Sequence, residues 1–158
     1  MRIGIGYDVH GFHFSRPLVI GGVTVPDAPG LAGHSDADVA CHAIIDALLG
    51  AAALGDLGEH FPEGTVPEGT ASVELLVRTR EMLAEAGFRV ANVDVTVVIE
   101  DVRVAPHRDE IRTSIAAALA VDPGRVSVKA TTTDGLGFVG RGEGALGVAV
   151  ALIEETGE

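Results

Sequence analysis

The amino-acid sequence predicts an α/β sandwich, a mixed β-sheet covered on one face by helices. Its 158 residues match one compact domain, so residues 1–158 are expected to form a single domain. The apolar fraction of 47% is enough for a sizeable core. Element patterns follow one another as strands, helix, helix, strand, helix, strand, strand. The predicted strands are apolar at nearly every position, so we expect a partner subunit to cover the second sheet face.

The N-terminal segment predicts two strands. Residues 2–7 alternate small and apolar side chains, which predicts a strand that ends in Asp8-Val9-His10. Gly21-Gly22 separates two β-branched and aliphatic triplets, the pattern of a two-residue hairpin. A loop rich in proline and glycine is expected over residues 26–33.

A helix and a long loop are predicted next. Ser35, with Asp38 three residues later, resembles a capping box, and a stretch rich in Ala, Leu and Ile continues to about Ala53. Residues 54–70 are rich in glycine, proline and acidic residues and show no period, which predicts a loop. Loops of this length in compact domains are more often functional than not.

The second half of the chain alternates helical and strand patterns. Helices are predicted to begin at Ser72, with a stop at Gly87, and at Pro106, with an end near Pro123-Gly124. The predicted strands cover residues 93–99, 126–130 and 145–153, and a polar, glycine-rich loop covers residues 131–144.

Charge and composition narrow the class of protein. With 11 basic and 23 acidic residues the net charge is −12, the wrong sign for binding nucleic acid or an anionic membrane surface. The single cysteine excludes a disulfide framework and a multi-cysteine zinc site. The N-terminus lacks a signal-peptide pattern, and there is no uncharged apolar run of about 18 residues. We therefore expect a cytoplasmic protein.

Two histidines and an aspartate form a candidate metal site. Asp8 and His10 are two residues apart on a strand, so both side chains leave the same face. His42 lies on the first predicted helix between Asp38 and Asp46, four residues away on either side, and one of these carboxylates could accept its second N–H. Two histidines and one aspartate leave a fourth position open, which suits a catalytic zinc. The alternative is a solvated polar seam along the helix.

Further residues could face phosphate groups. His34-Ser35 stands at the expected N-terminus of the first helix, where free N–H groups attract anions; a plain helix cap is the alternative. Lys129 precedes Thr131-Thr132-Thr133 and Asp134, which could otherwise be an exposed strand end. Arg141 lies in a glycine-rich turn, where a local ion pair is the alternative.

Taken in order, these segments resemble the 2-C-methyl-D-erythritol 2,4-cyclodiphosphate synthase family. The resemblance covers essentially the whole chain. It rests on RIGIGYDVHGF, LVIGGV, GHSDADVACHAIIDALLGAAALGDLGEHFP, NVDVTVVI, KATTTDGLGFVGRGEGALG and their spacing.

The resemblance implies a lyase of the non-mevalonate pathway of isoprenoid (terpenoid) biosynthesis. The implied assembly is a homotrimer with active sites between neighbouring subunits. The implied substrate is a cytidine diphosphate ester, 4-diphosphocytidyl-2-C-methyl-D-erythritol 2-phosphate. Its 2-phosphate attacks the β-phosphate, closing the cyclic diphosphate and releasing CMP.

The resemblance also implies a role for individual residues. Zinc, or another divalent cation, is held by Asp8, His10 and His42. A second ion, magnesium or manganese, lies at the diphosphate, with Asp134 as its possible ligand. His34 and Thr132 are the implied catalytic residues that stabilise the transition state. The implied substrate-binding residues are Asp8, Val9, His10, His34, Ser35, Asp56, Leu57, Gly58, Phe61, Glu63, Thr131, Thr132, Thr133, Asp134, Phe138 and Arg141.

Three segments depart from the family pattern. Asp134 stands where the family usually has glutamate, so contact with the second ion could run through water. Glu63-Gly64-Thr65 replaces a D-T-D sequence, which weakens the expected contacts to the diol of the substrate. Residues 99–103 replace an A-Q-A-P-K-type run at the cytosine pocket, where backbone groups are expected to read the base.

Two other functions compete with the cyclising lyase. A zinc-dependent phosphohydrolase would use the same ions to activate water, but the sequence offers no obvious additional base. A non-catalytic trimeric ligand-binding module would not require an open position on the zinc.

Overall fold

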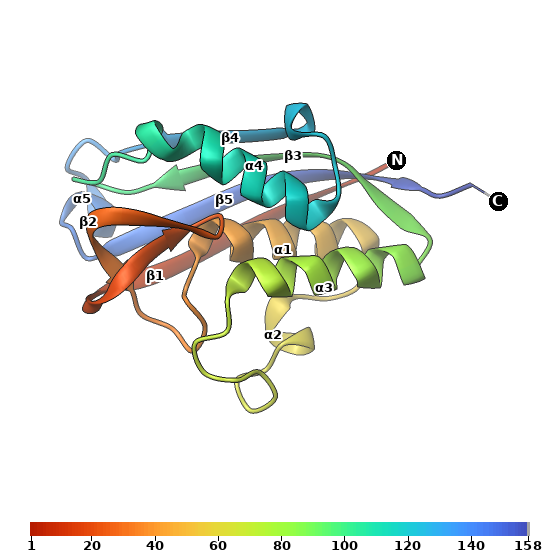
Figure 1. Ribbon diagram of the computed structural model, residues 1–158, viewed down its shortest axis with the longest axis horizontal. Coiled ribbons are helices and arrows are strands. Elements are labelled where there is room, and N and C mark those ends of the chain that lie inside the picture. The colour runs from red at the N-terminus through yellow and green to blue at the C-terminus, as the bar shows by residue number, and fades with distance from the viewer. Residues whose placement is uncertain (158) are drawn as a thin grey trace.

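Five strands form one mixed sheet with helices packed on it in the structure, a computed structural model that describes residues 1–157 (Figure 1). The strand order is β2-β1-β5-β3-β4; β3 and β4 are parallel and all other neighbours are antiparallel. The strands are β1 (Arg2–Ile20), β2 (Val23–Leu31), β3 (Phe88–Val98), β4 (Val126–Thr131) and β5 (Gly144–Glu155). The predicted mixed sheet with packed helices is confirmed.

Three long helices lie on the same side of this sheet, with α1 across β1 and β5 and α4 near β4 (Figure 1). Two short helices and two 3-10 turns, Ala105–His107 and Pro123–Arg125, complete the chain. The helices are α1 (Val39–Ala52), α2 (Leu57–His60), α3 (Ser72–Glu85), α4 (Arg108–Leu119) and α5 (Gly137–Gly140). The predicted helices from Ser72 and around Pro106 are confirmed, and α2 and α5 lie inside segments that were expected to be loops.

The β1–β2 hairpin is longer than its sequence pattern indicates. Its turn is the predicted Gly21-Gly22, with φ angles of +57° and +78° that favour glycine. Instead of the loop expected over residues 26–33, β2 continues to Leu31 and pairs with Phe12 on β1. Pro17 on β1 and Pro29 on β2 face one another at a shift in strand register. Proline is tolerated at such an irregularity, because the backbone N–H that it lacks is not needed for a hydrogen bond between the strands. Prolines therefore did not end this hairpin.

The first helix begins later than predicted: its first residue is Val39 and its N-cap is Asp38, three residues after the predicted cap Ser35. The Asp38 carboxylate caps this helix, because it accepts hydrogen bonds from the backbone N–H groups of Ala40 and Cys41, both at 3.1 Å. Ala37 has a φ of +57°, which no α-helical residue adopts, so the helix cannot extend back to Ser35. The prediction that Ser35 caps this helix is wrong because Asp38 supplies the cap instead.

Glycines on the inner face of the sheet bring α1 into direct backbone contact with it. Gly4 and Gly6 on β1 and Gly147 on β5 lie beneath the helix. A Cβ atom on any of them would lie 1.8 to 2.1 Å from a backbone carbonyl oxygen of α1. No side chain fits there, so α1 lies as close to β1 as the two backbones allow.

The outer face of the sheet is apolar and uncovered in the single chain. Ile3 and Ile5 are each 71% exposed, Tyr7 is 60% exposed and Val9 is 40% exposed. They alternate with the inward glycines along β1, and their neighbours on β5 are also aliphatic. This confirms that helices cover one face only. Among residues 1–157, none of the helices combines the length and the apolar character required to cross a membrane.

Replacement of Gly6 by alanine should destabilise the fold. The new Cβ would lie 1.8 Å from the Ala43 carbonyl oxygen, so α1 must move away from the sheet. We expect a loss of about 3 kcal/mol in the free energy of unfolding, measured by urea denaturation. Gly50→Ala is the control, because nothing lies within 4 Å of its added Cβ. Equal stability of Gly6→Ala and wild type would contradict the backbone contact.

Candidate metal centre and active site

Asp8, His10 and His42 form a compact cluster between β1 and α1. Asp8 Oδ2 lies 3.0 Å from His10 Nε2 and 3.1 Å from His42 Nδ1, and the two ring nitrogens are 3.1 Å apart. These three ligand atoms lie within 4.8 Å of one another. Asp8 and His10 share the inner face of β1, as their spacing predicts, and the close seating of α1 brings His42 to them.

The other nitrogen of each ring has its own hydrogen-bond partner. His10 Nδ1 donates to the Ala32 carbonyl oxygen at 2.6 Å. His42 Nε2 lies 2.9 Å from Ser72 Oγ and 3.1 Å from Ser35 Oγ. These contacts orient both rings so that the remaining nitrogens face Asp8. Ser72 is a site residue that the sequence patterns did not indicate, because it lies 30 residues from His42.

The prediction that Asp38 or Asp46 supports His42 is wrong. The Asp38 carboxylate is fully buried, caps α1 and accepts the Gly22 N–H at 2.7 Å. Burial raises its pKa. Asp46 accepts the Leu57 N–H at 2.8 Å, and burial likewise raises its pKa. Both carboxylates accept hydrogen bonds from backbone N–H groups instead of from His42. The helical spacing of these residues in the sequence does not predict those partners.

The electrostatics of the cluster favour a negative charge on Asp8 and a positive charge on His10 when no ion is bound. Burial by itself would raise the pKa of Asp8, but hydrogen bonds and charge from His10 and His42 outweigh it and hold the pKa well below its usual range. Burial by itself would lower the pKa of His10, yet the Asp8 carboxylate raises it overall. One carboxylate oxygen and two imidazole nitrogens, all half-buried or buried and facing one point, are a donor set that fits a divalent cation.

A cavity of about 190 Å³, here called the histidine cavity, opens beside this cluster. It brings together predicted site residues from β1, α1 and the long loop. Its lining comprises Asp8, His10, Gly33, His34, Ser35, His42, Leu57, Phe61, Glu63, Val66 and Leu75. Asp56, by contrast, uses its carboxylate to cap α2 through the Glu59 N–H at 3.0 Å, and Gly58 is exposed on that helix.

His34-Ser35 does not stand at the N-terminus of a helix. It lies in the segment before α1, whose first helical residue is Val39, and Asp38 already occupies the free N–H groups. Arg16 instead holds this segment, because its guanidinium donates to the carbonyl oxygens of Gly33, at 2.6 Å, and of Ser35. His34 Nε2 donates to the Val66 carbonyl oxygen at 2.6 Å. The anion-binding helix terminus expected there is therefore absent from the described residues.

The threonine run lies in a different cavity. Thr131 and Thr132 line a space of about 440 Å³, here called the threonine cavity. Its other lining residues are Ile99, Val102, Arg103, Val104, Ala105, Pro106 and Ala130. The two cavities share no lining residue. The predicted site residues of one chain are thus divided between two separate cavities.

The remaining predicted residues line neither of these two cavities. Phe138 is on α5, and Arg141 Nε donates to Glu143 Oε1 at 2.7 Å, the local ion pair weighed as its alternative. Val9 points to the outer face of the sheet. Lys129 pairs with Asp94 at 2.7 Å on neighbouring strands, so its charge is already matched.

Glu100 holds the turn that carries Asp134. Its Oε2 accepts the Thr133 N–H at 3.1 Å and its Oε1 accepts the Gly135 N–H at 3.2 Å. Asp134, between them, has a φ of +55°, a left-handed conformation that asparagine and aspartate tolerate best after glycine. The sequence patterns did not indicate this role, because residues 99–103 stood out only as a departure from the family pattern.

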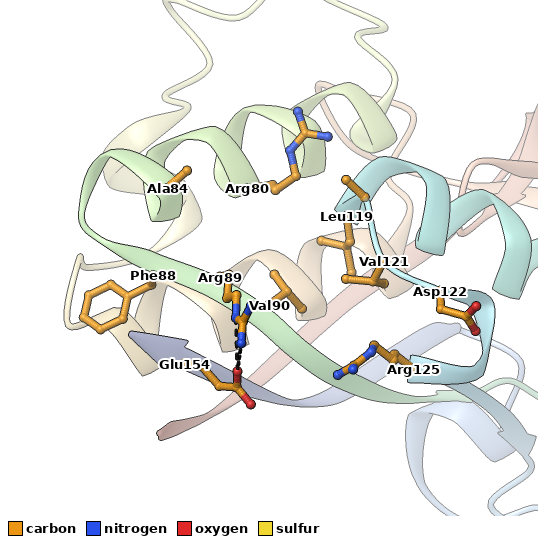
Figure 2. A pocket seen from close by; sticks show the side chains of 11 residues that line it. Arg80, Ala84, Phe88, Arg89, Val90, Leu119, Val121, Asp122, Arg125 and Glu154 are labelled. Atoms are coloured by element: carbon orange, nitrogen blue, oxygen red, sulfur yellow. Dashed lines mark hydrogen bonds and ion pairs between the residues drawn. The ribbon is translucent and has the colours of Figure 1, made fainter. Parts of the chain in front are cut away.

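A further cavity, of about 520 Å³, lies where α3 and α4 end and β3 begins. Figure 2 shows its lining, in which Arg89 pairs with Glu154 at 2.8 Å. The Arg80 guanidinium, also drawn there, is directed away from that pair and donates to the Ala118 carbonyl oxygen. None of the predicted site residues lines this cavity, so it is not the candidate active site.

Comparison with known proteins finds a family and close relatives that match nearly the whole chain. A model of the YgbB family matches residues 1–154. The 2-C-methyl-D-erythritol 2,4-cyclodiphosphate synthase of Moorella thermoacetica is 56% identical over 154 residues, 97% of this chain and 94% of that protein.

Solved structures agree in fold. The bifunctional IspDF of Campylobacter jejuni superposes with a TM-score of 0.93 and 38% identity over 98% of this chain, which spans only 42% of that longer chain. A Plasmodium falciparum structure described as an IspF CDP complex gives a TM-score of 0.86 and 29% identity, over 99% of this chain and 97% of that one.

Replacement of Glu100 by alanine should loosen the Asp134 turn. Two backbone N–H groups lose a carboxylate acceptor, worth about 1.5 kcal/mol each for a charged, partly exposed partner. We expect amide hydrogen exchange at Thr133 and Gly135 to accelerate by roughly tenfold or more. Glu100→Gln, which keeps one acceptor oxygen, should show a smaller effect, and Glu110→Ala on exposed α4 none. Unchanged exchange in Glu100→Ala would refute this role.

Proposed function

The chain belongs to the YgbB family, and on that premise we propose that it converts 4-diphosphocytidyl-2-C-methyl-D-erythritol 2-phosphate into 2-C-methyl-D-erythritol 2,4-cyclodiphosphate and CMP. This is the cyclodiphosphate-forming step of non-mevalonate isoprenoid biosynthesis, and the enzyme is a cyclising lyase. The observation that carries the assignment is the Asp8–His10–His42 group, which shares one cavity with His34 and Ser35. The chain acts as one domain in the cytoplasm under this proposal.

The proposed reaction depends more on the positioning of the two phosphoryl groups than on a strong general base. The attacking 2-phosphate is already anionic near neutral pH, so its oxygen needs no general base. The two phosphoryl groups repel one another, and the protein must hold them in line while charge is spread over the transferred group. The residues of the chain therefore serve mainly to bind and orient anions.

We assign the first ion to Asp8, His10 and His42, with zinc favoured by two nitrogen ligands, one oxygen ligand and an open fourth position. When bound, such an ion supplies positive charge to a phosphoryl oxygen. Magnesium or manganese is proposed for the diphosphate, with Asp134 as a direct or water-mediated ligand on its exposed turn.

His34 and Thr132 are proposed as the catalytic residues. The Nε2–H of His34 is held by the Val66 carbonyl oxygen, which fixes the ring at the edge of the histidine cavity. Arg16 fixes the backbone on either side of it. Ser35, Leu57, Phe61 and Glu63 line the same cavity and are proposed to hold the methylerythritol end. Asp56 and Gly58 would contribute from the first turn of α2.

The nucleotide end is assigned to the threonine cavity. Its apolar side chains, including Ile99, Val102 and Pro106, suit a flat pyrimidine base. Thr131 to Thr133, with Phe138 and Arg141, are proposed to hold the ribose and phosphates. Glu100 keeps the adjacent turn in place.

A homotrimer completes the proposed site. The exposed apolar outer face of β1 and β5 is the surface that another copy of the chain would cover. Because the two cavities of one chain share no residue, we propose that the histidine cavity of one subunit meets the threonine cavity of its neighbour. Val9, on the outer face of β1, lies close to where such neighbours would meet.

Phosphorus NMR of the products tests the function. Purified enzyme with Zn²⁺ and Mg²⁺ should yield the cyclic diphosphate and CMP in equal amounts. Linear phosphate products would refute cyclisation and support a phosphohydrolase. If the substrate is bound but not converted, the result would support a non-catalytic binding module. His42→Ala should lose metal binding and activity together, each by at least about 100-fold, because a ligand is removed. The control is His13→Ala, an exposed histidine outside the cluster.

Light scattering tests the trimer. Wild-type protein should have three times the 16.2 kDa mass of one chain. Ile5→Lys places a charge in the apolar outer face, where Ile5 is 71% exposed in one chain, and should give monomers. Because the proposed site needs two subunits, activity should fall by about 100-fold or more. Thr113→Lys, on the exposed side of α4, makes a matched charge change that should leave the trimer intact. A wild-type monomer that is active would overturn shared sites.

A further inference from the structure

His42 is contacted on its far side by two buried serine hydroxyl groups. Ser72, the first residue of α3, is fully buried, and its Oγ lies 2.9 Å from His42 Nε2. Ser35 Oγ lies 3.1 Å from the same nitrogen and 3.2 Å from Ser72 Oγ. The reaction described above gives Ser72 no role.

The hydrogen-bond directions around Ser72 have only one consistent solution. Asp36 Oδ1 accepts from both the backbone N–H of Ser72, at 3.1 Å, and its hydroxyl group. A hydroxyl group has one proton, and a carboxylate can only accept. Since that proton points to Asp36, Ser72 Oγ can only accept from His42.

The direction at Ser72 determines the tautomer of His42. Nε2 must carry a proton, so in the neutral ring that metal ligation requires, Nδ1 presents its lone pair toward Asp8 and His10. In its neutral form His10 shows the same arrangement, because the Ala32 carbonyl oxygen can only accept, so Nδ1 carries the proton and the Nε2 lone pair faces the cluster. Both rings thus offer a lone pair to the same point.

We propose that Ser72 and Asp36 form a positioning pair that locks His42 in the Nε2–H tautomer and so prepares Nδ1 to ligate the metal. Asp36 precedes α1 and Ser72 begins α3, so the packing of α3 beside α1 sets up the ligand before any ion binds. This inference rests on the metal centre of the proposed function. It concerns a residue outside the cavity lining, since Ser72 touches the ring and not the substrate space.

A purely structural role for Ser72 predicts something different. If the hydroxyl group only stabilised the start of α3, its removal would lower stability and leave the tautomer and the metal affinity unchanged. The positioning role predicts a loss of zinc affinity that exceeds any general loss of stability. Supporting groups behind metal-ligating histidines typically contribute 10- to 100-fold in affinity.

Two measurements on the full-length protein decide between these roles. Zinc affinity is measured by competition with a chelator, and the protonation of each ring nitrogen in the metal-free protein by nitrogen-15 NMR of the histidine rings. Wild type should show His42 protonated at Nε2. Ser72→Ala should bind Zn²⁺ about 10- to 100-fold more weakly and lose the single tautomer, and Asp36→Ala should follow it. Ser72→Thr, which keeps the hydroxyl group, should restore most of the affinity.

Thr79→Ala is the matched control. Thr79 is also fully buried on α3, two turns further along, and its hydroxyl group donates to the Leu75 carbonyl oxygen at 2.9 Å, away from His42. Its loss should affect stability without affecting zinc. Wild-type zinc affinity in folded Ser72→Ala, or a neutral wild-type His42 ring protonated at Nδ1 and not at Nε2, would overturn the inference. Failure of wild type to bind any divalent ion would instead overturn the metal centre, while the tautomer in metal-free protein would still test Ser72.

Discussion

The backbone contact between α1 and the glycines of the sheet is the constraint on which the rest of the structure depends. Gly4, Gly6 and Gly147 leave no side chain between the helix and β1 or β5. His42 can therefore reach Asp8 and His10, whose side chains continue the same inner face of β1. The glycines near the N-terminus set the distance between α1 and β1. Because that distance is short, His42 on α1 lies close enough to Asp8 and His10 on β1 to form the cluster.

Around that contact, polar side chains bind the backbone of the segment that precedes α1. Asp38 joins the β1–β2 turn to the helix N-terminus, and Arg16 holds the carbonyl oxygens on both sides of His34. Asp36 and Ser72 connect the same segment to α3 and to His42. Buried polar networks of this kind hold a unique geometry only when every member is paired. Metal ligands, the proposed catalytic histidine and three secondary-structure elements are consequently held by one set of hydrogen bonds.

The net charge of −12 has a different meaning at the site than over the whole surface. It argues against long polyanions as partners, yet the proposed substrate is itself a small polyanion. Two cationic side chains that were predicted to face the substrate, Lys129 and Arg141, are instead paired with Asp94 and Glu143, and Asp38 caps the N-terminus of α1. Under the proposed function, bound cations would supply positive charge to the substrate, and the carboxylates and histidines that line the histidine cavity are suited to hold such an ion.

Features that depend on residues close together in the chain could be predicted from the amino-acid sequence. The Gly21-Gly22 turn, the helix from Ser72 and the shared face of Asp8 and His10 follow from local periodicity and backbone preference. The hydrogen-bond partner of each polar group, by contrast, follows from how distant segments pack in the folded chain. A carboxylate at helical spacing from His42 was a plausible support, but a serine 30 residues away provides it, and Asp38 rather than Ser35 caps α1. Hydrogen bonds are short-ranged and directional, so a choice among several nearby donors and acceptors is settled only when distant segments have packed.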